Sequence, residues 1–261
     1  MTARPTADLP AATPVPAAAA AAPVPTSPPA APLPPRAALR LSIILPVLDE
    51  SAAIGATLDA LAPLRAAGHE VLVVDGGSQD NTVALCRGAG CPVFGSARGR
   101  ARQMNAGAAQ AQGEVLVFLH ADTQLPARAD LLIGLAVQQG ALWGRFDVRI
   151  QGPSRLLPVI AALMNLRSRG SGIATGDQAM FVRRDLFQRL GGFADQALME
   201  DIDLSRRLRA VGRPACLRQP VHTSGRRWQT HGVWRTIWLM WRLRWRYWRG
   251  VSPELLARDY R

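Results

Sequence analysis

Four short apolar segments, separated by stretches with helical spacing, constrain the fold of this chain more than any other feature. They cover residues 39–47, 70–77, 91–96 and 114–122, and they are rich in Val, Ile and Leu. Such segments are typical of strands that are buried on both faces, as in a parallel sheet covered by helices. The alternation of strands and helices therefore predicts an α/β fold with a mostly parallel, doubly wound sheet.

The segments between and after these strands predict helices. One begins near Ser51, a plausible N-cap, and others cover residues 80–90 and 100–113. Residues 153–169 form a further apolar helix flanked by Arg. For this helix two roles stay open, because it is suited either to packing in the core or to covering a lipid-like acceptor.

Polar side chains follow three of the four predicted strands. In open α/β sheets, ligands bind beyond the carboxyl ends of the strands. The residues at these ends are Asp49, Glu50, Asp75, Ser78, Asp80, His120 and Asp122. We expect a ligand site at this edge, with Asp75 accepting hydrogen bonds and Asp122 suited to a divalent cation that bridges a diphosphate. A dinucleotide site is disfavoured, since no G-x-G-x-x-G follows the first strand.

Five segments follow one another along the chain between roughly residues 40 and 230. They are "LSIILPVLDE", "VLVVDGGSQDNT", "GRARQMNAGAAQAQGEVLVFLHADT", "GDQAMFVRR" and "GGFADQALMEDIDLSRRLR". In this order they resemble the family 2 glycosyltransferases of GT-A fold, and the chain is most similar to a bacterial subgroup of the arsenosugar-biosynthesis type. The resemblance implies an enzyme that moves a sugar from a nucleotide-diphospho-sugar to a hydroxyl acceptor, either a small molecule or lipid-linked.

The resemblance also implies which residues bind the donor and a metal ion. Residues implied to contact the nucleotide-sugar are Pro46, Glu50, Asp75, Ser78, Arg98 or Arg102, and Asn105. Asp122 matches the last Asp of the family's D-x-D motif, which ligates a divalent cation, Mn²⁺ or Mg²⁺. His120 replaces the first Asp of that motif, and imidazole also binds such ions. His222 or His231 is a further candidate ligand.

The pair Glu200-Asp201 matches the "ED" motif, whose Asp is the general base of inverting members. A base of this kind removes the proton of the acceptor hydroxyl as the anomeric carbon is attacked. Like charges on Glu200 and Asp203 are expected to raise the pKa of Asp201. The same acids also fit an ordinary acidic first turn of a helix. Asp177 and Gln178 fall in a segment implied to contact the donor sugar or the acceptor.

Positive charge is concentrated at the C-terminal end of the chain. The net charge is +12, and every basic residue is Arg. Residues 204–261 contain 14 Arg and two acidic residues, so the remaining 203 residues are neutral overall. Arg226 and Arg227 are suited to bidentate contact with a diphosphate, although simple surface charge explains them equally well.

Residues 233–249 predict an amphipathic helix that carries Trp along one side. Spacings of four, three, four and three separate Trp234, Trp238, Trp241, Trp245 and Trp248. The stripe is suited either to docking on the catalytic domain or to peripheral membrane contact, with the arginines meeting anionic lipid. No nucleic-acid-binding module accompanies this segment, so nucleic acid is not an expected partner.

The remaining features set the predicted organisation of the chain. Residues 1–38 are read as a disordered tail without an export signal, because the first 35 residues hold 11 Pro and 12 Ala. Residues 39–230 are the predicted GT-A domain, and 231–261 the basic helix and tail. Three scattered Cys form no disulfide framework, which favours a cytoplasmic protein. Peripheral contact with the cytoplasmic face of the membrane is compatible with this location.

Two other classes of protein are compatible with parts of the sequence. One is a nucleotidyltransferase-like protein on a related sheet, which is disfavoured because residues 48–55 are not a basic, Gly-rich phosphate loop. The other is a non-catalytic protein that binds nucleotide-sugars, or that binds membrane or nucleic acid through its Arg/Trp-rich C-terminus. His120, in place of a motif Asp, is the feature that best supports a non-catalytic role.

Overall fold

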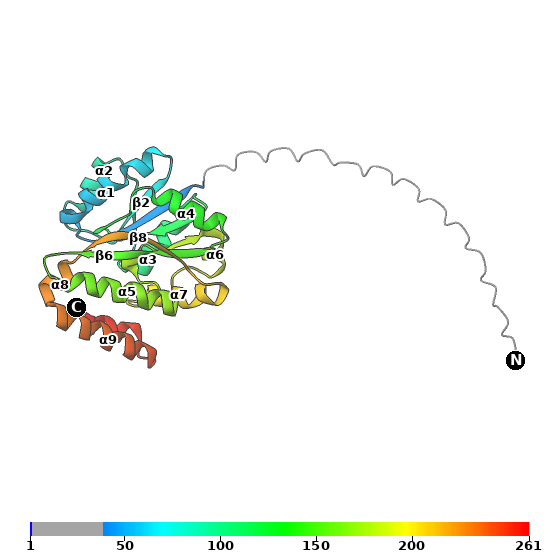
Figure 1. Cartoon of the computed structure of the whole chain (residues 1–261). Helices are drawn as coiled ribbons and strands as arrows, with labels where there is room; N and C mark the ends of the chain where they lie inside the picture. Colours follow the sequence, from blue (N-terminus) through cyan, green and yellow to red (C-terminus); the bar gives the residue numbers. More distant parts are fainter. Residues whose placement is uncertain (2–38, 261) are drawn as a thin grey trace, which may run out of the picture. The chain divides into compact units, whose positions relative to one another are not determined.

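The computed structural model describes Met1 and residues 39–260. The predicted disordered tail therefore lies outside the described residues. Residues 39–260 contain one eight-stranded sheet (Figure 1). The strands are β1 (Leu41–Val47), β2 (Glu70–Asp75), β3 (Val93–Gly95), β4 (Val115–Phe118), β5 (Thr123–Gln124), β6 (Trp143–Gln151), β7 (Phe181–Arg183) and β8 (Ala215–Ser224).

Ten α-helices and one 3₁₀ turn, Gly176–Gln178, accompany the sheet in the described part of the chain. The helices are α1 (Ser51–Ala66), α2 (Thr82–Gly88), α3 (Arg100–Gln110), α4 (Ala129–Gln138), α5 (Leu157–Ser171), α6 (Arg184–Arg189), α7 (Glu200–Val211), α8 (Arg226–His231), α9 (Val233–Trp248) and α10 (Pro253–Tyr260). Among them, none is both long enough and apolar enough to cross a bilayer.

The order of the strands confirms a mostly parallel, doubly wound sheet. The order is β3-β2-β1-β4-β7-β6-β8-β5, and β1 is parallel to both β2 and β4. Strand β7 runs antiparallel to β4 and β6. Because β7 is reversed, the 3₁₀ turn just before it lies at the edge of the sheet where β1, β2 and β4 end. This reversal brings residues 176–178 to the predicted ligand edge.

Side chains of successive strand residues enter two cores on opposite faces of the sheet. In β1, Ile43 and Leu45 belong to a cluster that includes side chains of α1, α4 and α5. Ile44 between them belongs to the other cluster, with side chains of α3, α6 and α7. This alternation follows from the two-residue period of a strand. Burial on both faces explains why the strands read as continuous apolar runs.

Two local features differ from the sequence-based expectation. The fourth strand ends at Phe118 rather than continuing to residue 122. Ser51 is the first residue of α1 rather than its N-cap. The reason is a cap from a distant segment, because the Ser51 N–H donates to Asp80 Oδ2 at 3.0 Å.

The C-terminal region continues beyond the predicted helix. Helix α10 packs against α9, and both contribute to a small apolar cluster with Leu198 and Met199. These two residues directly precede Glu200, the first residue of α7. The basic C-terminal segment is thus packed next to the start of the helix that carries the "ED" pair.

Candidate active site

The polar residues after β1 and β2 form a hydrogen-bonded group, called here the strand-end cluster (Asp49, Glu50, Asp75, Ser78 and Asp80). Asp75 accepts hydrogen bonds from the N–H groups of Gly77 and Ser78 at 3.1 Å. Ser78 Oγ in turn accepts the N–H of Asp49 at 3.0 Å, which joins the ends of the two strands. The carboxyl ends of β1 and β2 are therefore held together by side-chain oxygens that accept backbone N–H bonds.

Asp80 caps two helices at once. Its carboxylate accepts the Thr82 N–H at 2.9 Å and the Ser51 N–H at 3.0 Å. The hydrogen bonds from Thr82 and then from Ser51 hold the pKa of Asp80 well below its usual range. Thr82 Oγ1 also accepts the Glu50 N–H at 2.8 Å. These bonds fix the loop that carries Glu50 relative to the loop that carries Asp75.

Residues from three distant segments meet beside this cluster. Arg226, at the start of α8, donates to Glu50 at 3.0 Å. Strand β5 pairs with β8, and the Ser224 N–H donates to the Asp122 carbonyl at 3.2 Å. The hydrogen bond and charge of Glu50, and then the charge of Asp122, raise the pKa of Arg226. A guanidinium and two carboxylates are thus brought close together, although 176 positions separate Glu50 from Arg226.

Asp122, which the resemblance assigns to a metal ion, is suited to that role by its chemistry. Within the described residues its carboxylate receives one long side-chain contact, from Thr123 Oγ1 at 3.5 Å. The described part of the chain has no group of three His, Cys, Asp or Glu residues that would hold an ion unaided. Hard cations at diphosphates are commonly held by one or two carboxylates and by phosphate oxygens. The donor set at Asp122 fits that arrangement.

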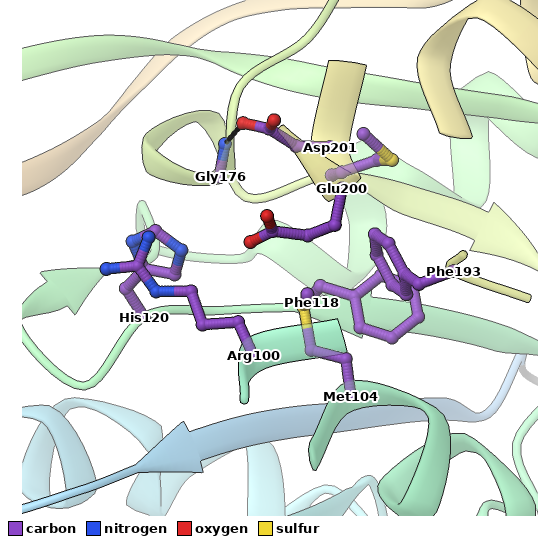
Figure 2. A pocket seen from close by; sticks show the side chains of 9 residues that line it. Arg100, Met104, Phe118, His120, Gly176, Phe193, Glu200 and Asp201 are labelled. Carbon is purple, nitrogen blue, oxygen red and sulfur yellow. Dashed lines mark hydrogen bonds between the residues drawn. The ribbon is translucent and has the colours of Figure 1, made fainter. Parts of the chain in front are cut away.

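A cavity next to Asp201 has one polar and one apolar wall (Figure 2). Arg100, His120 and Glu200 line the polar side, and in Figure 2 the Glu200 carboxylate points toward the side of the cavity where Arg100 and His120 lie. The opposite wall consists of Met104, Phe118 and Phe193 in Figure 2. The lining residues are Arg100, Met104, Phe118, His120, Gly176, Met180, Phe193, Glu200 and Asp201. We call this space the acidic cavity.

Asp201 lies in the first turn of α7 and is oriented by two backbone N–H groups. Gly176 donates to its Oδ2 at 2.9 Å, and Ile202 donates to its Oδ1 at 2.7 Å. Burial, and then the charge of Glu200, raise the pKa of Asp201 to about 6 in spite of these bonds. A carboxylate with a pKa near neutrality accepts a proton more readily than an ordinary Asp.

The cause of this raised pKa differs in part from the sequence-based expectation. Repulsion from Asp203 was expected to contribute, but Asp203 pairs with Arg207, four residues on, at 2.7 Å. Burial contributes most, and it is a property that only the fold creates. Glu200, which is 6% exposed, makes the second contribution as expected.

His120 belongs to the acidic cavity, where it pairs with Asp177. Its Nδ1 lies 3.3 Å from Asp177 Oδ1. Burial disfavours the charge of Asp177, but the hydrogen bond from His120 and the charges of Arg100 and Arg227 lower its pKa. Gly176 approaches the other side of the ring so closely that a Cβ there would lie 2.4 Å from His120 Nε2. The 3₁₀ turn therefore fixes both His120 and Asp201.

Residues 42–191 match the family described as "Glycosyl transferase family 2". This match spans more than half of the chain. The chain belongs to the family 2 glycosyltransferases. Its closer resemblance to the arsenosugar-biosynthesis subgroup stays a prediction.

Curated relatives and solved structures agree with this assignment. The chain is 29% identical over 205 residues to a "PGL/p-HBAD biosynthesis glycosyltransferase" of Mycobacterium bovis, covering 71% of the chain and 75% of the relative. It is 28% identical over 199 residues to "Beta-monoglucosyldiacylglycerol synthase" of Synechocystis sp., covering 65% of the chain. This match spans only 40% of the length of the cyanobacterial relative.

Comparison of structures shows the GT-A fold. The mannosyltransferase PcManGT of Pyrobaculum calidifontis, solved with GDP-Man and Mn²⁺, superposes with a TM-score of 0.56 at 20% identity. The superposition covers 85% of the chain and 69% of that protein. A divalent ion and a nucleotide-sugar are thus found together in a protein of this fold.

Several residues that the family resemblance assigned to substrate have structural partners instead. Arg102 forms an ion pair with Asp195 at 2.7 Å, and Arg98 is exposed in the turn before α3. Asn105 binds the backbone of Phe193 through both ends of its amide, at 2.8 and 2.9 Å. The Asn105 amide thus holds the backbone of Phe193, a residue that lines the acidic cavity, whereas Arg98 and Arg102 lie on the surface.

Arg100 lines the cavity of this glycosyltransferase in the position expected for Arg98 or Arg102. The spacing of residues along the predicted helix could have identified Arg100 from the sequence. Arg100 and Met104 are four residues apart and share a face of α3, and both line the cavity. Arg102 lies about 200° around the helix from Arg100 and so points elsewhere.

Two further expectations are corrected by the contacts that the side chains make. Gln178 is fully buried and forms a capping box with Thr175, so its amide holds the 3₁₀ turn and does not contact a sugar. Arg227 stacks on the ring of Tyr260, with the guanidinium carbon 3.6 Å from its centroid, and donates to the Tyr260 carbonyl at 2.9 Å. Arg227 therefore anchors α10, whereas Arg226 stays at the strand-end cluster.

Proposed function

We propose that this protein transfers a sugar from a nucleotide-diphospho-sugar to an acceptor hydroxyl, with inversion at the anomeric carbon. The observation that carries the proposal is the state of Asp201. Its carboxylate is half-buried beside Glu200, it is oriented by Gly176 and Ile202, and its pKa is raised to about 6. These properties are those of a general base that works near neutral pH.

The reaction is a direct displacement. Asp201 removes the proton of the acceptor hydroxyl while the hydroxyl oxygen attacks the anomeric carbon. The bond from that carbon to the diphosphate breaks on the opposite face, and the diphosphate leaves with the bonding electrons. Arg226, beside Glu50 and Asp122, is placed to stabilise the leaving diphosphate. A divalent ion held by Asp122 would neutralise part of the same charge.

The strand-end cluster is the proposed binding region for the nucleoside. Pro46, Asp75 and Ser78 lie at or just beyond the ends of β1 and β2, where a doubly wound sheet binds its ligand. The proposed carrier is uridine or guanosine diphosphate, since an acid at position 75 accepts hydrogen bonds from either base. The names of the relatives, which include a glucosyldiacylglycerol synthase, support a lipid-linked acceptor over a soluble one.

Thermal unfolding in the presence of donors tests the binding half of the proposal. UDP-, GDP-, CMP- and dTDP-sugars are added with and without Mn²⁺, and release of nucleoside diphosphate is followed in parallel. A donor at 100 times its Kd should stabilise the folded protein by about 2.7 kcal/mol. We expect one nucleotide class to stabilise the protein, with a larger effect when Mn²⁺ is present.

The variant Asp122→Asn tests the contribution of the metal ion separately from the contribution of the nucleotide. This variant should lose the Mn²⁺-dependent part of the stabilisation and keep the part seen without metal. Asp59→Asn, which changes an exposed acid on α1, is the matched control and should behave as the unmodified protein. Equal Mn²⁺ dependence in Asp122→Asn would remove Asp122 from the metal role. Absence of stabilisation by every donor would overturn the proposed function.

A further inference from the structure

Helix α9 has two apolar faces, and only one of them is covered by protein. Leu243 and Thr236 are at most 1% exposed and pack toward the rest of the molecule. On the opposite side of the helix lies the tryptophan face, formed by Trp234, Trp238, Trp241, Trp245 and Trp248, each between 58% and 78% exposed. Of the two roles that the sequence left open for this stripe, docking on the catalytic domain is excluded by the exposure of all five indoles. Five exposed indoles on one face mark a surface for interaction.

Helix α5 presents a second exposed apolar stripe. The leucine stripe consists of Leu156, Val159, Leu163 and Leu166, which are 38% to 67% exposed. The opposite side of α5, which includes Leu157 and Ile160, is buried in the sheet core. One face of this helix packs in the core, as the first of its two expected roles requires, while the other face is exposed to solvent.

The two exposed stripes belong to neighbouring helices. Val233 and Ile237 of α9 pack against the core cluster that contains Leu157 and Ile160 of α5. Figure 1 shows α5 in green and α9 in orange and red running alongside each other. Each of these two helices therefore leaves one apolar stripe exposed and packs its other side on the same core cluster.

The charged side chains of α5 and α9 are all positive. Neither α5 nor α9 contains an Asp or Glu residue. Arg242 and Arg246 pair with Asp259 of α10, whereas Arg235 and Arg249 are exposed. Arg249 also lies over the ring of Trp245, 5.3 Å from its centroid. Exposed indoles flanked by guanidiniums match the interface of a bilayer with anionic headgroups, where Trp lies at headgroup depth and Arg meets phosphate.

We propose that the tryptophan face and the leucine stripe together dock this protein on an anionic phospholipid bilayer. The docking is peripheral, because each helix keeps one face packed on the protein. The small cluster of α9 and α10 includes Met199, the residue before Glu200, so the docked surface is joined to the helix that carries Asp201. Docking would therefore place the acidic cavity at the membrane. The inference does not depend on sugar transfer and is tested by binding alone.

Sedimentation of the full chain with lipid vesicles tests the proposal. Vesicles of phosphatidylcholine, which are neutral, are compared with vesicles that also contain about 30 mol% of the anionic lipid phosphatidylglycerol. We expect binding to the anionic vesicles, with a blue shift of Trp fluorescence, and weakening of the binding by salt. Failure to bind the anionic vesicles would overturn the proposal.

Surface variants identify the residues responsible. Trp238→Gln, Trp241→Gln and Trp245→Gln combined should weaken vesicle binding at least tenfold, and Leu163→Gln with Leu166→Gln should weaken it several-fold. The matched control changes Leu131 and Leu135, two exposed leucines of α4, to Gln and should leave binding unchanged. Because every one of these side chains is exposed, melting temperatures should stay within a few degrees. Equal loss of binding in the α4 control would overturn the assignment of the surface.

Charge variants and two competing occupants complete the test. Arg235→Gln with Arg249→Gln should reduce binding to anionic vesicles roughly 30-fold and leave binding to neutral vesicles unchanged, because each Arg near the surface contributes about 1 kcal/mol. A dimer that the tryptophan variant abolishes would assign this face to a second copy of the chain. Preference for an oligoribonucleotide over vesicles would assign it to nucleic acid. Either of these results would overturn the proposal.

Discussion

Two groups of carboxylates lie at the same edge of the sheet, in opposite environments. Asp75 and Asp80 of the strand-end cluster accept several hydrogen bonds close to solvent, and the pKa of Asp80 is lowered. In the acidic cavity Glu200 is buried and Asp201 half-buried, and the pKa of Asp201 is raised. The first group is suited to staying ionised and holding a loop, and the second to exchanging a proton.

The difference shows that position on a helix does not by itself make a catalytic acid or base. Asp80 and Asp201 both lie at or next to the start of a helix, and both accept two backbone N–H bonds. Such bonds favour the charged form. Only at Asp201 does burial beside another carboxylate outweigh them. Burial and the neighbouring charge therefore distinguish Asp201, the proposed base, from Asp80, the helix cap.

The largest expected effect comes from removing the proton acceptor of the cavity. Asp201→Asn keeps the shape of the side chain but cannot take the acceptor proton, so kcat should fall by roughly 10² to 10⁴-fold. Nucleotide affinity should change by less than about twofold, since Arg226 and the strand-end cluster are untouched. Steady-state transfer rates and nucleotide titration provide the two measurements. A variant that kept full kcat would show that another group is the base.

A smaller loss is expected when the cavity is distorted and its acids are left in place. In Gly176→Ala the new Cβ would lie 2.4 Å from His120 Nε2, so the ring and the turn must move apart. Since Gly176 also orients Asp201, kcat should fall about ten- to a hundred-fold. The control is Gly95→Ala at the end of β3, where no atom lies within 4 Å of the new Cβ. Equal activities of the two variants would mean that the geometry of the turn is unimportant.

Much of this comparison could be anticipated from the sequence. The strand ends were predictable because a parallel sheet places all its carboxyl ends at one edge, which brings Glu50, Asp75 and Asp122 together. Asp201 was predictable from the resemblance of "MEDIDL" to the family motif. Both inferences use information that lies within short segments of the chain.

Contacts between distant segments were beyond sequence reasoning. The sequence around Arg227 gives no sign of its contact with Tyr260, which lies 33 residues further along the chain. The diphosphate role expected for Arg227 could therefore not be corrected from the sequence. The exposure of the tryptophan face was equally undecided, since α9 is apolar on two sides and periodicity alone does not say which side packs. Leu243 is buried because Leu198, Met199 and Leu256 cover it, and these contacts exist only in the folded chain.

A moderate effect is expected in the pH dependence of activity, which tests whether the raised pKa of Asp201 distinguishes it from the acids of the strand-end cluster. Asp201 must be deprotonated to act, so kcat/KM should rise as the pH increases through about 6. The charge of Glu200 contributes to this raised pKa, so Glu200→Gln should move the acid limb to lower pH. In contrast, Asp203→Asn should leave the limb in place, because Asp203 is paired with Arg207. If the acid limb of the kcat/KM profile stayed at the same pH in Glu200→Gln, burial alone would explain the raised pKa of Asp201.

The smallest effect on activity is expected at the strand-end cluster, where the acid acts as a cap. Asp80→Ala removes the acceptor of the Ser51 and Thr82 N–H groups, so the melting temperature should fall by a few degrees. Because the folded-state pKa of Asp80 is lowered, its contribution is present above the unfolded value near 3.8 and is lost as the pH falls below it. The difference in melting temperature between Asp80→Ala and the unmodified protein should therefore shrink in acid.

Asp59→Ala, at an exposed acid on α1, is the control for Asp80→Ala and should unfold like the unmodified protein. Since Asp80 also ties the loop of Glu50 to that of Asp75, donor affinity should fall slightly in Asp80→Ala, while kcat at saturating donor stays within about twofold. A large loss of kcat in Asp80→Ala with an unchanged melting temperature would contradict the role of Asp80 as a cap. Asp80 would then belong to the chemistry, and burial would no longer separate the two groups of carboxylates.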